Sequence, residues 1–316
     1  MNKTLLTGLL CCSLSIQSFA DQPLEGFTYG SVNAPTGKEW ESPENLAAQQ
    51  RAAACLFLSV PHWIMPARYC RKTVSIGSHL TVTGSFTGTR PRLLPKDFYQ
   101  TEYDVSSWDA IPVPSSWNIY GIQKDGSQKY GTPIYVNQPV IFQHSVKVND
   151  WRGGVMRTPP ANWTTYKDRN EVGSFRRDFE IPQDWDGREV FISFDGVDSF
   201  FYLWINGQYV GFSKNSRNTA NFNITPYLQK GKNTVAAEVY RSSDGSFLEA
   251  QDMFRLPGIF RTVALYSVPK VHFRDLVATP DLDVTYTDGS LTVNAESVTW
   301  IRSHQRLSKY SYSYIS

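Results

Sequence analysis

The stretch "FDGVDSFFYLWINGQYVGFS", from Phe194 to Ser213, decides the fold class. Two runs of aromatic and β-branched residues, "FFYLWI" and "QYVGF", flank the dipeptide Asn206-Gly207. Both turn residues tolerate a positive φ, and the type I′ turn that they form matches the twist of two paired strands. The stretch therefore predicts an antiparallel β-hairpin.

Similar runs lie on both sides of this hairpin. Val190, Ile192 and Phe194 recur at every second position, which is typical of a strand with one buried face. Further short runs rich in strand-forming residues are "SFRRDFEI" (174–181), "EVFISFDGV" (189–197), "NTVAAEVY" (233–240) and "GIFRTVALYSV" (258–268). Together they predict an all-β protein with a sandwich that ends near Pro269. Residues 270–296 read as two strands of a second β domain.

The overall charge narrows the classes of partner. The 316 residues include 31 Lys and Arg against 29 Asp and Glu, which gives a net charge of +2. Nothing in this balance indicates nucleic acid or an anionic membrane as a partner. Aromatic residues make up 14% of the chain, and most of them are expected to fill the sandwich core.

The first twenty residues have the pattern of a secretory signal. An early Lys3 precedes an apolar run, and Ser18-Phe19-Ala20 forms the small-x-small ending of a cleavage site. We therefore expect a secreted or periplasmic protein whose residues 21–45 form an N-terminal arm. No later segment is long and apolar enough for a membrane helix. Cys55 and Cys70 are left after cleavage, and no disulfide is assigned to them.

Two segments differ in composition from the rest. Residues 46–96 contain no Asp or Glu and have no sustained apolar period, and the tail 297–316 is likewise free of acids. One hypothesis is that both are translated out of frame, which would leave the first of them poorly ordered. The alternative, a basic linker and a basic tail, fits the composition equally well.

Several motifs, taken in order, resemble one enzyme family. They are "EWESPE" (39–44), "VPSSWNIYG" (113–121), "YGTPIYVNQPVIF" (130–142), "FDGVDSFFYLWINGQYVGFSKNSRNTANFNI" (194–224) and "SDGSFLEAQDMFRLPGIFR" (243–261). This set resembles the N-terminal sugar-binding domain of glycoside hydrolase family 2, and within it the large bacterial β-galactosidases. The resemblance implies a galactose-binding-like jelly-roll sandwich over residues 97–269, then the start of an immunoglobulin-like sandwich over 270–296. In the family a (β/α)8 barrel that carries the catalysis follows.

The resemblance also implies site residues. Asp252 is expected to reach the sugar pocket, where it would bind a sodium ion and the primary hydroxyl of galactose, and Asn137 would bond further sugar hydroxyls. A carboxylate accepts from hydroxyls and suits a hard cation, while an amide both donates and accepts. The alternatives are an ion pair of Asp252 with Arg255 and a turn role for Asn137. Phe254 is a candidate for stacking on the sugar ring.

The same resemblance implies sodium and magnesium as cofactors of the full-length enzyme, β-galactosides as substrates, and often a homo-oligomer. For the other carboxylates near Asp252 we expect structural roles. Asp244 precedes Gly245 and reads as a turn former, and Glu249 as part of a buried salt bridge that holds its loop. Trp204 is expected to pack within its strand.

The catalytic pair of a retaining glycosidase is not found in the chain. The pair Asn170-Glu171 lies in the polar stretch "YKDRNEVGSF", without the apolar strand that a barrel would place before it, and reads as a loop. A barrel takes about 250 residues, and fewer than 50 follow Lys270. We expect a truncated N-terminal part of a β-galactosidase that is inactive alone. The alternatives are a free-standing carbohydrate-binding module, the non-functional product of a frameshifted gene, and a relative that acts on β-glucuronides or β-mannosides.

Overall fold

The computed structural model describes residues 35, 39, 47–48, 50–51, 72–75, 80–84, 95–133, 170–249, 253–301 and 304–315. The chain divides into two compact units. One contains residues 27–53 and 68–269, and the other contains residues 1–26, 54–67 and 270–316. Each unit is described by itself.

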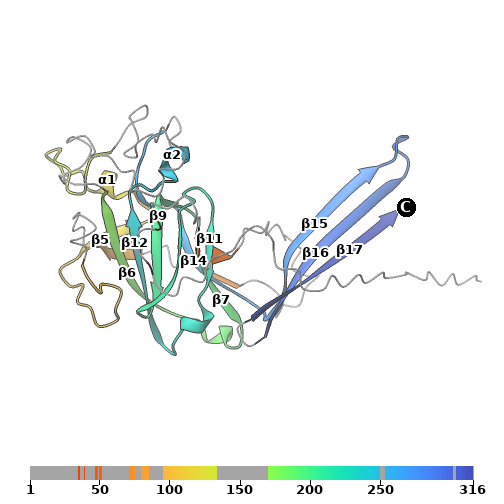
Figure 1. Ribbon diagram of the computed structural model, residues 1–316, viewed down its shortest axis with the longest axis horizontal. Helices are drawn as coiled ribbons and strands as arrows, with labels where there is room; N and C mark the ends of the chain where they lie inside the picture. Colours follow the sequence, from red (N-terminus) through yellow and green to blue (C-terminus); the bar gives the residue numbers. More distant parts are fainter. Residues whose placement is uncertain are drawn as a thin grey trace, which may run out of the picture. The chain divides into compact units, whose positions relative to one another are not determined.

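The first unit is a sandwich of two antiparallel five-stranded sheets (Figure 1). The first sheet has the order β1 (Ala47–Ala48), β10 (Gln208–Ser213), β9 (Phe200–Ile205), β12 (Lys232–Tyr240) and β6 (Val172–Glu180). The second has the order β2 (Gln50–Arg51), β11 (Ala220–Asn223), β7 (Glu189–Phe194), β14 (Val263–Val268) and β3 (Lys72–Ser75). The all-β sandwich predicted from the sequence is therefore confirmed.

Short elements complete this unit. Two further strand pairs join β13 (Gly258–Ile259) to β8 (Val197–Asp198) and β4 (Leu80–Gly84) to β5 (Asp109–Val113). Its described residues include the helices α1 (Trp117–Tyr120) and α2 (Ser246–Glu249) and the 3-10 turns η4 (Gln183–Trp185) and η5 (Thr225–Tyr227). Among the described residues no helix is long and apolar enough to cross a membrane.

The predicted hairpin has the expected turn. Asn206 and Gly207 have φ values of 50° and 78°, and Gln208 pairs with Ile205 across the turn. The Asn206 side chain holds the turn against its neighbours, because its Nδ2 donates to the Tyr227 carbonyl at 2.9 Å. The dipeptide thus determines the register of β9 against β10.

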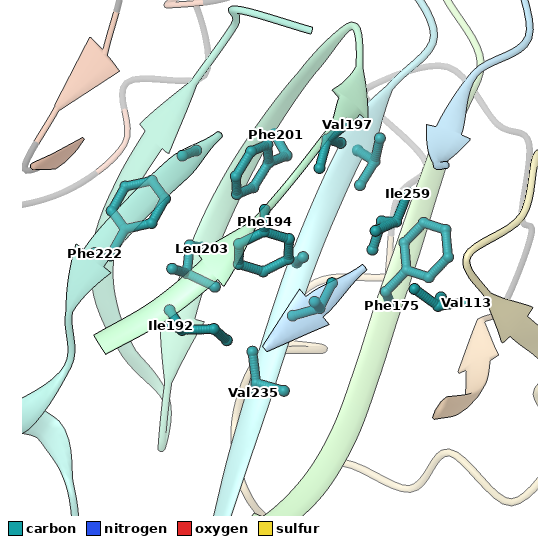
Figure 2. Close-up of a cluster of buried hydrophobic side chains, with 14 of the residues drawn as sticks. Val113, Phe175, Ile192, Phe194, Val197, Phe201, Leu203, Phe222, Val235 and Ile259 are labelled. Atoms are coloured by element: carbon teal, nitrogen blue, oxygen red, sulfur yellow. The ribbon is translucent and has the colours of Figure 1, made fainter. Parts of the chain in front are cut away.

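Strand β9 is buried on both faces, which explains its unbroken apolar sequence. Phe201, Leu203 and Ile205 lie in the core between the two sheets, together with Ile192, Phe194 and Val235 (Figure 2). The alternate residues Phe200, Tyr202 and Trp204 belong to a second cluster on the other face of the sheet. Each large apolar side chain buried this way stabilises the fold by about 1.5–3 kcal/mol.

The segment from Phe98 to Trp108 contributes to this second cluster. Tyr99 stacks on Trp204 with ring centroids 5.0 Å apart, so Trp204 has the packing role expected of it. The buried guanidinium of Arg176 donates to the carbonyls of Phe98 at 3.3 Å and Tyr103 at 2.8 Å. One cation thereby ties the segment to β6.

Parts of the acid-free segment 46–96 pair with the sandwich. Strand β1 pairs with β10, β2 with β11, β3 with β14, and β4 with β5. These strands lie between residues 47 and 84, and the intervening residues lie outside the described part of the chain. The out-of-frame hypothesis concerns the gene and stays a prediction.

In the second unit the described residues of 270–316 form one three-stranded antiparallel sheet. Its order is β15 (Val271–Leu282), β16 (Gly289–Ile301) and β17 (His304–Ile315) (Figure 1). The two strands expected over 270–296 are present, and β16 continues to Ile301. Most of the acid-free tail is a third strand, which pairs with β16 from Ile301 to Ser290. The immunoglobulin-like character of this unit stays a prediction.

Candidate functional site

Two of the three predicted sugar-binding residues, Asn137 and Asp252, lie outside the described residues. The third, Phe254, is described, and the residue is 53% exposed. The described residues closest to them include Thr132, which precedes Asn137, and Met253, which follows Asp252.

These flanking residues belong to one end of the sandwich, which we call the α1–α2 end because Figure 1 shows both helices there. It contains the two helices, the start of β6, the residues after β12, and the β8–β13 pair. Backbone bonds join its parts, since the Ser115 N–H donates to the Ile259 carbonyl and the Ser199 N–H to the Tyr240 carbonyl, both at 2.9 Å.

A buried ion pair holds the segment that leads to Asn137. Nη1 of Arg241 lies 2.6 Å from Oε2 of Glu171, and Nη2 of Arg241 donates to the Thr132 carbonyl at 2.6 Å. Asn118, which is fully buried on α1, donates to the Tyr130 carbonyl and, at 3.4 Å, to Glu171. The backbone from Tyr130 to Thr132 is therefore tied to β6, β12 and α1 together.

Gly131 is required by this arrangement. Its φ is +80°, and a Cβ atom built there would lie 2.0 Å from Oε1 of Glu171. A side chain at this position would have to displace the buried carboxylate. The Asn170-Glu171 pair was predicted to be a polar loop; both residues do precede β6 outside a strand, but both are buried.

A second buried ion pair holds the residues before α2. Nζ of Lys214 lies 3.1 Å from both oxygens of Asp244 and 3.0 Å from the Glu39 carbonyl. Burial lowers the pKa of Lys214 and raises that of Asp244, and their mutual attraction opposes both shifts. Asp244 also accepts from the Gly245 N–H at 2.8 Å, as a turn former does. Its turn role is confirmed, and the ion pair is an addition that the sequence did not reveal.

Glu249 holds a loop, but not through the salt bridge that we expected. Its carboxylate accepts from the Ser216 N–H at 3.0 Å and from the Ser216 hydroxyl at 2.5 Å. The partner is thus a neutral residue of the β10–β11 loop. A carboxylate that accepts two bonds from one residue fixes that loop against α2 without a cation.

The residue that follows Asp252 is held by Arg217. Nη2 of Arg217 lies 3.2 Å from Oδ2 of Asp198 and 3.3 Å from Sδ of Met253. Its guanidinium also lies over the ring of Phe260, 4.9 Å from the centroid. Burial raises the pKa of Asp198 to about 7, while the charge of Arg217 acts in the opposite direction.

The described residues contain no group of three or more His, Cys, Asp or Glu side chains that could hold a metal ion. Asp252, the residue expected to bind sodium, is outside them, so the sodium prediction is not tested. Asn118, Glu171, Lys214 and Arg217 were missed by sequence reasoning as supporting residues. Asn118 lies in the motif 113–121, and Lys214 and Arg217 lie in the motif 194–224. Membership of a motif that carries the resemblance was therefore the only sequence signal for these three residues.

The family model for the sugar binding domain of glycosyl hydrolases family 2 matches residues 89–269, more than half of the chain. The chain belongs to glycosyl hydrolase family 2. The matched range begins eight residues before the jelly-roll start expected at residue 97 and ends at the expected boundary.

Curated relatives from three bacteria are similar to this family 2 chain. A β-galactosidase of Priestia megaterium is 42% identical over 201 residues, which is 64% of this chain and 18% of that protein. A β-galactosidase of Halalkalibacterium halodurans is 39% identical over 65% of this chain, and one of Yersinia pestis is 39% identical over 66%. The chain spans about a fifth of the length of these relatives.

Solved structures of family 2 enzymes share the fold. A Bacteroides uniformis β-glucuronidase, covalently bound to cyclophellitol-6-carboxylate aziridine, has a TM-score of 0.51 at 18% identity over 78% of this chain and 28% of its own. A β-glucuronidase from glycoside hydrolase family 2 has a TM-score of 0.50 at 16% identity over 79% of this chain and 27% of its own. At these identities the likeness shows the fold alone.

Proposed function

We propose that this chain is the sugar-binding part of a secreted or periplasmic β-galactosidase, an enzyme that hydrolyses terminal non-reducing β-D-galactose residues with retention. The observation that carries the proposal is the 39–42% identity to proteins named β-galactosidase over about two thirds of the chain. The "QDM" motif, which contains Asp252, and the "IYVN" motif, which contains Asn137, favour galactose as the sugar.

The α1–α2 end supports this role because its ion pairs contact the flanks of both motifs. The Glu171–Arg241 pair bonds the Thr132 carbonyl, five residues before Asn137. The Asp198–Arg217 pair contacts Met253, which follows Asp252. Binding groups need a rigid supporting shell to keep their geometry, and two salt-bridged anchors at one end of a sandwich supply it.

We further propose that this chain forms one wall of the sugar pocket, and that a (β/α)8 barrel supplies the catalytic residues. Retaining hydrolysis needs two carboxyl groups about 5–5.5 Å apart, one protonated and one nucleophilic. Asn170-Glu171 does not supply such a group, because Glu171 is 3% exposed at its side chain and paired with Arg241. Asp252 would bind sodium together with ligands from the barrel, and magnesium would bind elsewhere in the enzyme.

A titration of the purified chain with galactose tests the binding proposal. We expect a dissociation constant in the millimolar range, which corresponds to about 4 kcal/mol, because half of the pocket is supplied by other residues. Asp252→Ala and Asn137→Ala should each weaken binding. Asp186→Ala is the matched control, since Asp186 is an exposed turn aspartate next to Gly187. Equal binding of galactose by wild type and Asp252→Ala would contradict the proposal.

Two further measurements separate the alternatives. The chain should not hydrolyse nitrophenyl β-galactoside faster than a buffer control. Hydrolysis that is removed by substituting a Glu of this chain would refute the proposal that a barrel supplies the catalytic groups. Micromolar galactose binding that Asp252→Ala abolishes would favour a free-standing carbohydrate-binding module. Tighter binding of glucuronate than of galactose would favour a β-glucuronidase.

A further inference from the structure

Arg217 joins three parts of the α1–α2 end that are distant in sequence. It lies in the loop between β10 and β11, and it contacts Asp198 on β8, Met253 after α2, and the ring of Phe260. Its own carbonyl accepts from Nη1 of Arg261 at 3.0 Å. The Arg217 side chain is 38% exposed, whereas the Asp198 side chain is 15% exposed, so the cation is at the surface and the carboxylate is mostly buried.

Asp198 is the anchor of this arrangement. Its backbone is fixed because Asp198 pairs with Gly258 in the β8–β13 ladder, and its side chain is 15% exposed. The charged groups that act on it are Arg217 from the β10–β11 loop, Glu249 from α2, Arg241 after β12, and Arg255 after Met253. Three of these four groups are cations, and their positive charges stabilise the ionised carboxylate of Asp198.

Burial opposes that ionisation. It raises the pKa of Asp198 to about 7, with Glu249 adding to the shift and the three arginines reducing it. Near neutral pH the carboxyl is therefore divided between a protonated form and an ionised form. The ionised form makes an ion pair with the guanidinium, whereas the protonated form can accept a hydrogen bond from it without the attraction between opposite charges.

We propose that Asp198 and Arg217 act as a positioning pair that fixes Met253, and that ionisation of Asp198 thereby increases the sugar affinity of the pocket. Neither residue is proposed to touch the sugar. Arg217 acts through Met253, which is covalently joined to Asp252, and the sugar part of the inference rests on the proposed function. Below neutral pH the pair is weakened, the restraint on Met253 is lost, and galactose binds less tightly.

Methyl NMR of methionine in the whole chain tests the placement of Met253 without any sugar. The chain has four methionines, so the spectrum is simple, and Met253→Leu assigns the signal. In wild type the Met253 methyl shift should titrate with a midpoint near pH 7. Asp198→Asn and Arg217→Ala should remove this titration, Arg217→Lys should restore part of it, and the remote control Lys232→Ala should keep it. A Met253 signal that is independent of pH, or unchanged in both variants, overturns the proposal.

Galactose titrations at pH 6 and pH 8 test the link to affinity. Wild type should bind galactose about fivefold to tenfold more tightly at pH 8 than at pH 6. A change in affinity of this size is at the low end of the coupling found between two sites. This difference should vanish in Asp198→Asn, while thermal melts at both pH values confirm that the variant is folded. If Asp252→Ala loses binding but Arg217→Ala keeps the wild-type affinity and pH difference, the positioning role is wrong. If Met253 titrates as expected but galactose does not bind, the proposed function fails and the placement of Met253 is supported.

Discussion

Arg241 and Glu171 form an ion pair with an Nη1–Oε2 distance of 2.6 Å, and their side chains are 7% and 3% exposed. The pair joins the residue after β12 to the residue before β6, at the strand ends where the backbone N–H of Arg241 also donates to the Glu171 carbonyl at 2.8 Å. Because the second Nη of Arg241 bonds the Thr132 carbonyl, the pair also holds the segment that leads to Asn137.

Breaking this pair should destabilise the sandwich strongly. Arg241→Met leaves the carboxylate of Glu171 buried without its cation, and such a loss costs about 3–5 kcal/mol. Equilibrium unfolding in urea measures the change in the free energy of unfolding. The control is Lys232→Ala, which breaks an exposed pair with Asp178 (69% and 47% exposed) and should cost at most about 1 kcal/mol. Equal losses for the two variants would show that Glu171 is not isolated from water.

Gly131→Ala should destabilise the fold more than Gly126→Ala. Gly126 has nearly the same φ, +81° against +80°, but a Cβ at Gly126 meets nothing within 4 Å. Gly126→Ala therefore reports the backbone cost alone, about 1–2 kcal/mol, whereas Gly131→Ala also drives a methyl group into Glu171. Thermal melts of the two variants compare them directly. Indistinguishable melting temperatures would contradict the close approach of Gly131 to Glu171.

Stability should fall as the pH rises from about 4 to about 7. Burial raises the pKa of Asp198 and of Glu238 to about 7 each, whereas both are lower in the unfolded chain. Between these values the folded state holds more protons, so the stabilisation present at pH 4 is lost as the pH passes through 7. For Asp198 alone the loss is on the order of 4 kcal/mol. Urea unfolding at several pH values measures the slope, and Asp198→Asn and Glu238→Gln should each flatten it. A slope that both variants leave unchanged would refute the raised pKa values of these two groups.

The strands could be predicted from sequence because their signals are local. Asn206-Gly207 specifies its own turn, and the alternation of Val190, Ile192 and Phe194 specifies a buried face within one strand. Strand β11 and the two short helices gave no comparable pattern: α1 and α2 are only four residues each, which is too short for a helical period.

The supporting residues of the site could not be predicted in the same way, because their partners are distant in sequence. Lys214 pairs with Asp244 and Glu171 with Arg241, across 30 and 70 residues, and neither pairing follows from a local pattern. The polar residues around Glu171 predict a solvated loop. In the fold the pairing of β6 with β12 places Glu171 beside Arg241, where both side chains are buried. The resemblance identifies the motifs, and the fold shows which charged residues contact the residues beside them.

Phe254→Ala should weaken galactose binding with only a small loss of stability. Phe254 is 53% exposed, so its removal should lower the free energy of unfolding by about 1 kcal/mol, roughly half of the value for a fully buried side chain. If the ring stacks on the sugar, its loss removes about 0.5–1.5 kcal/mol of binding, which is roughly a twofold to tenfold weaker affinity, and Phe254→Tyr should retain most of it. Leu248→Ala is the matched control, because Leu248 is an exposed apolar residue on α2, 79% exposed. Galactose titrations beside urea unfolding separate the two effects: equal affinity in Phe254→Ala and Leu248→Ala would assign Phe254 no part in the sugar site.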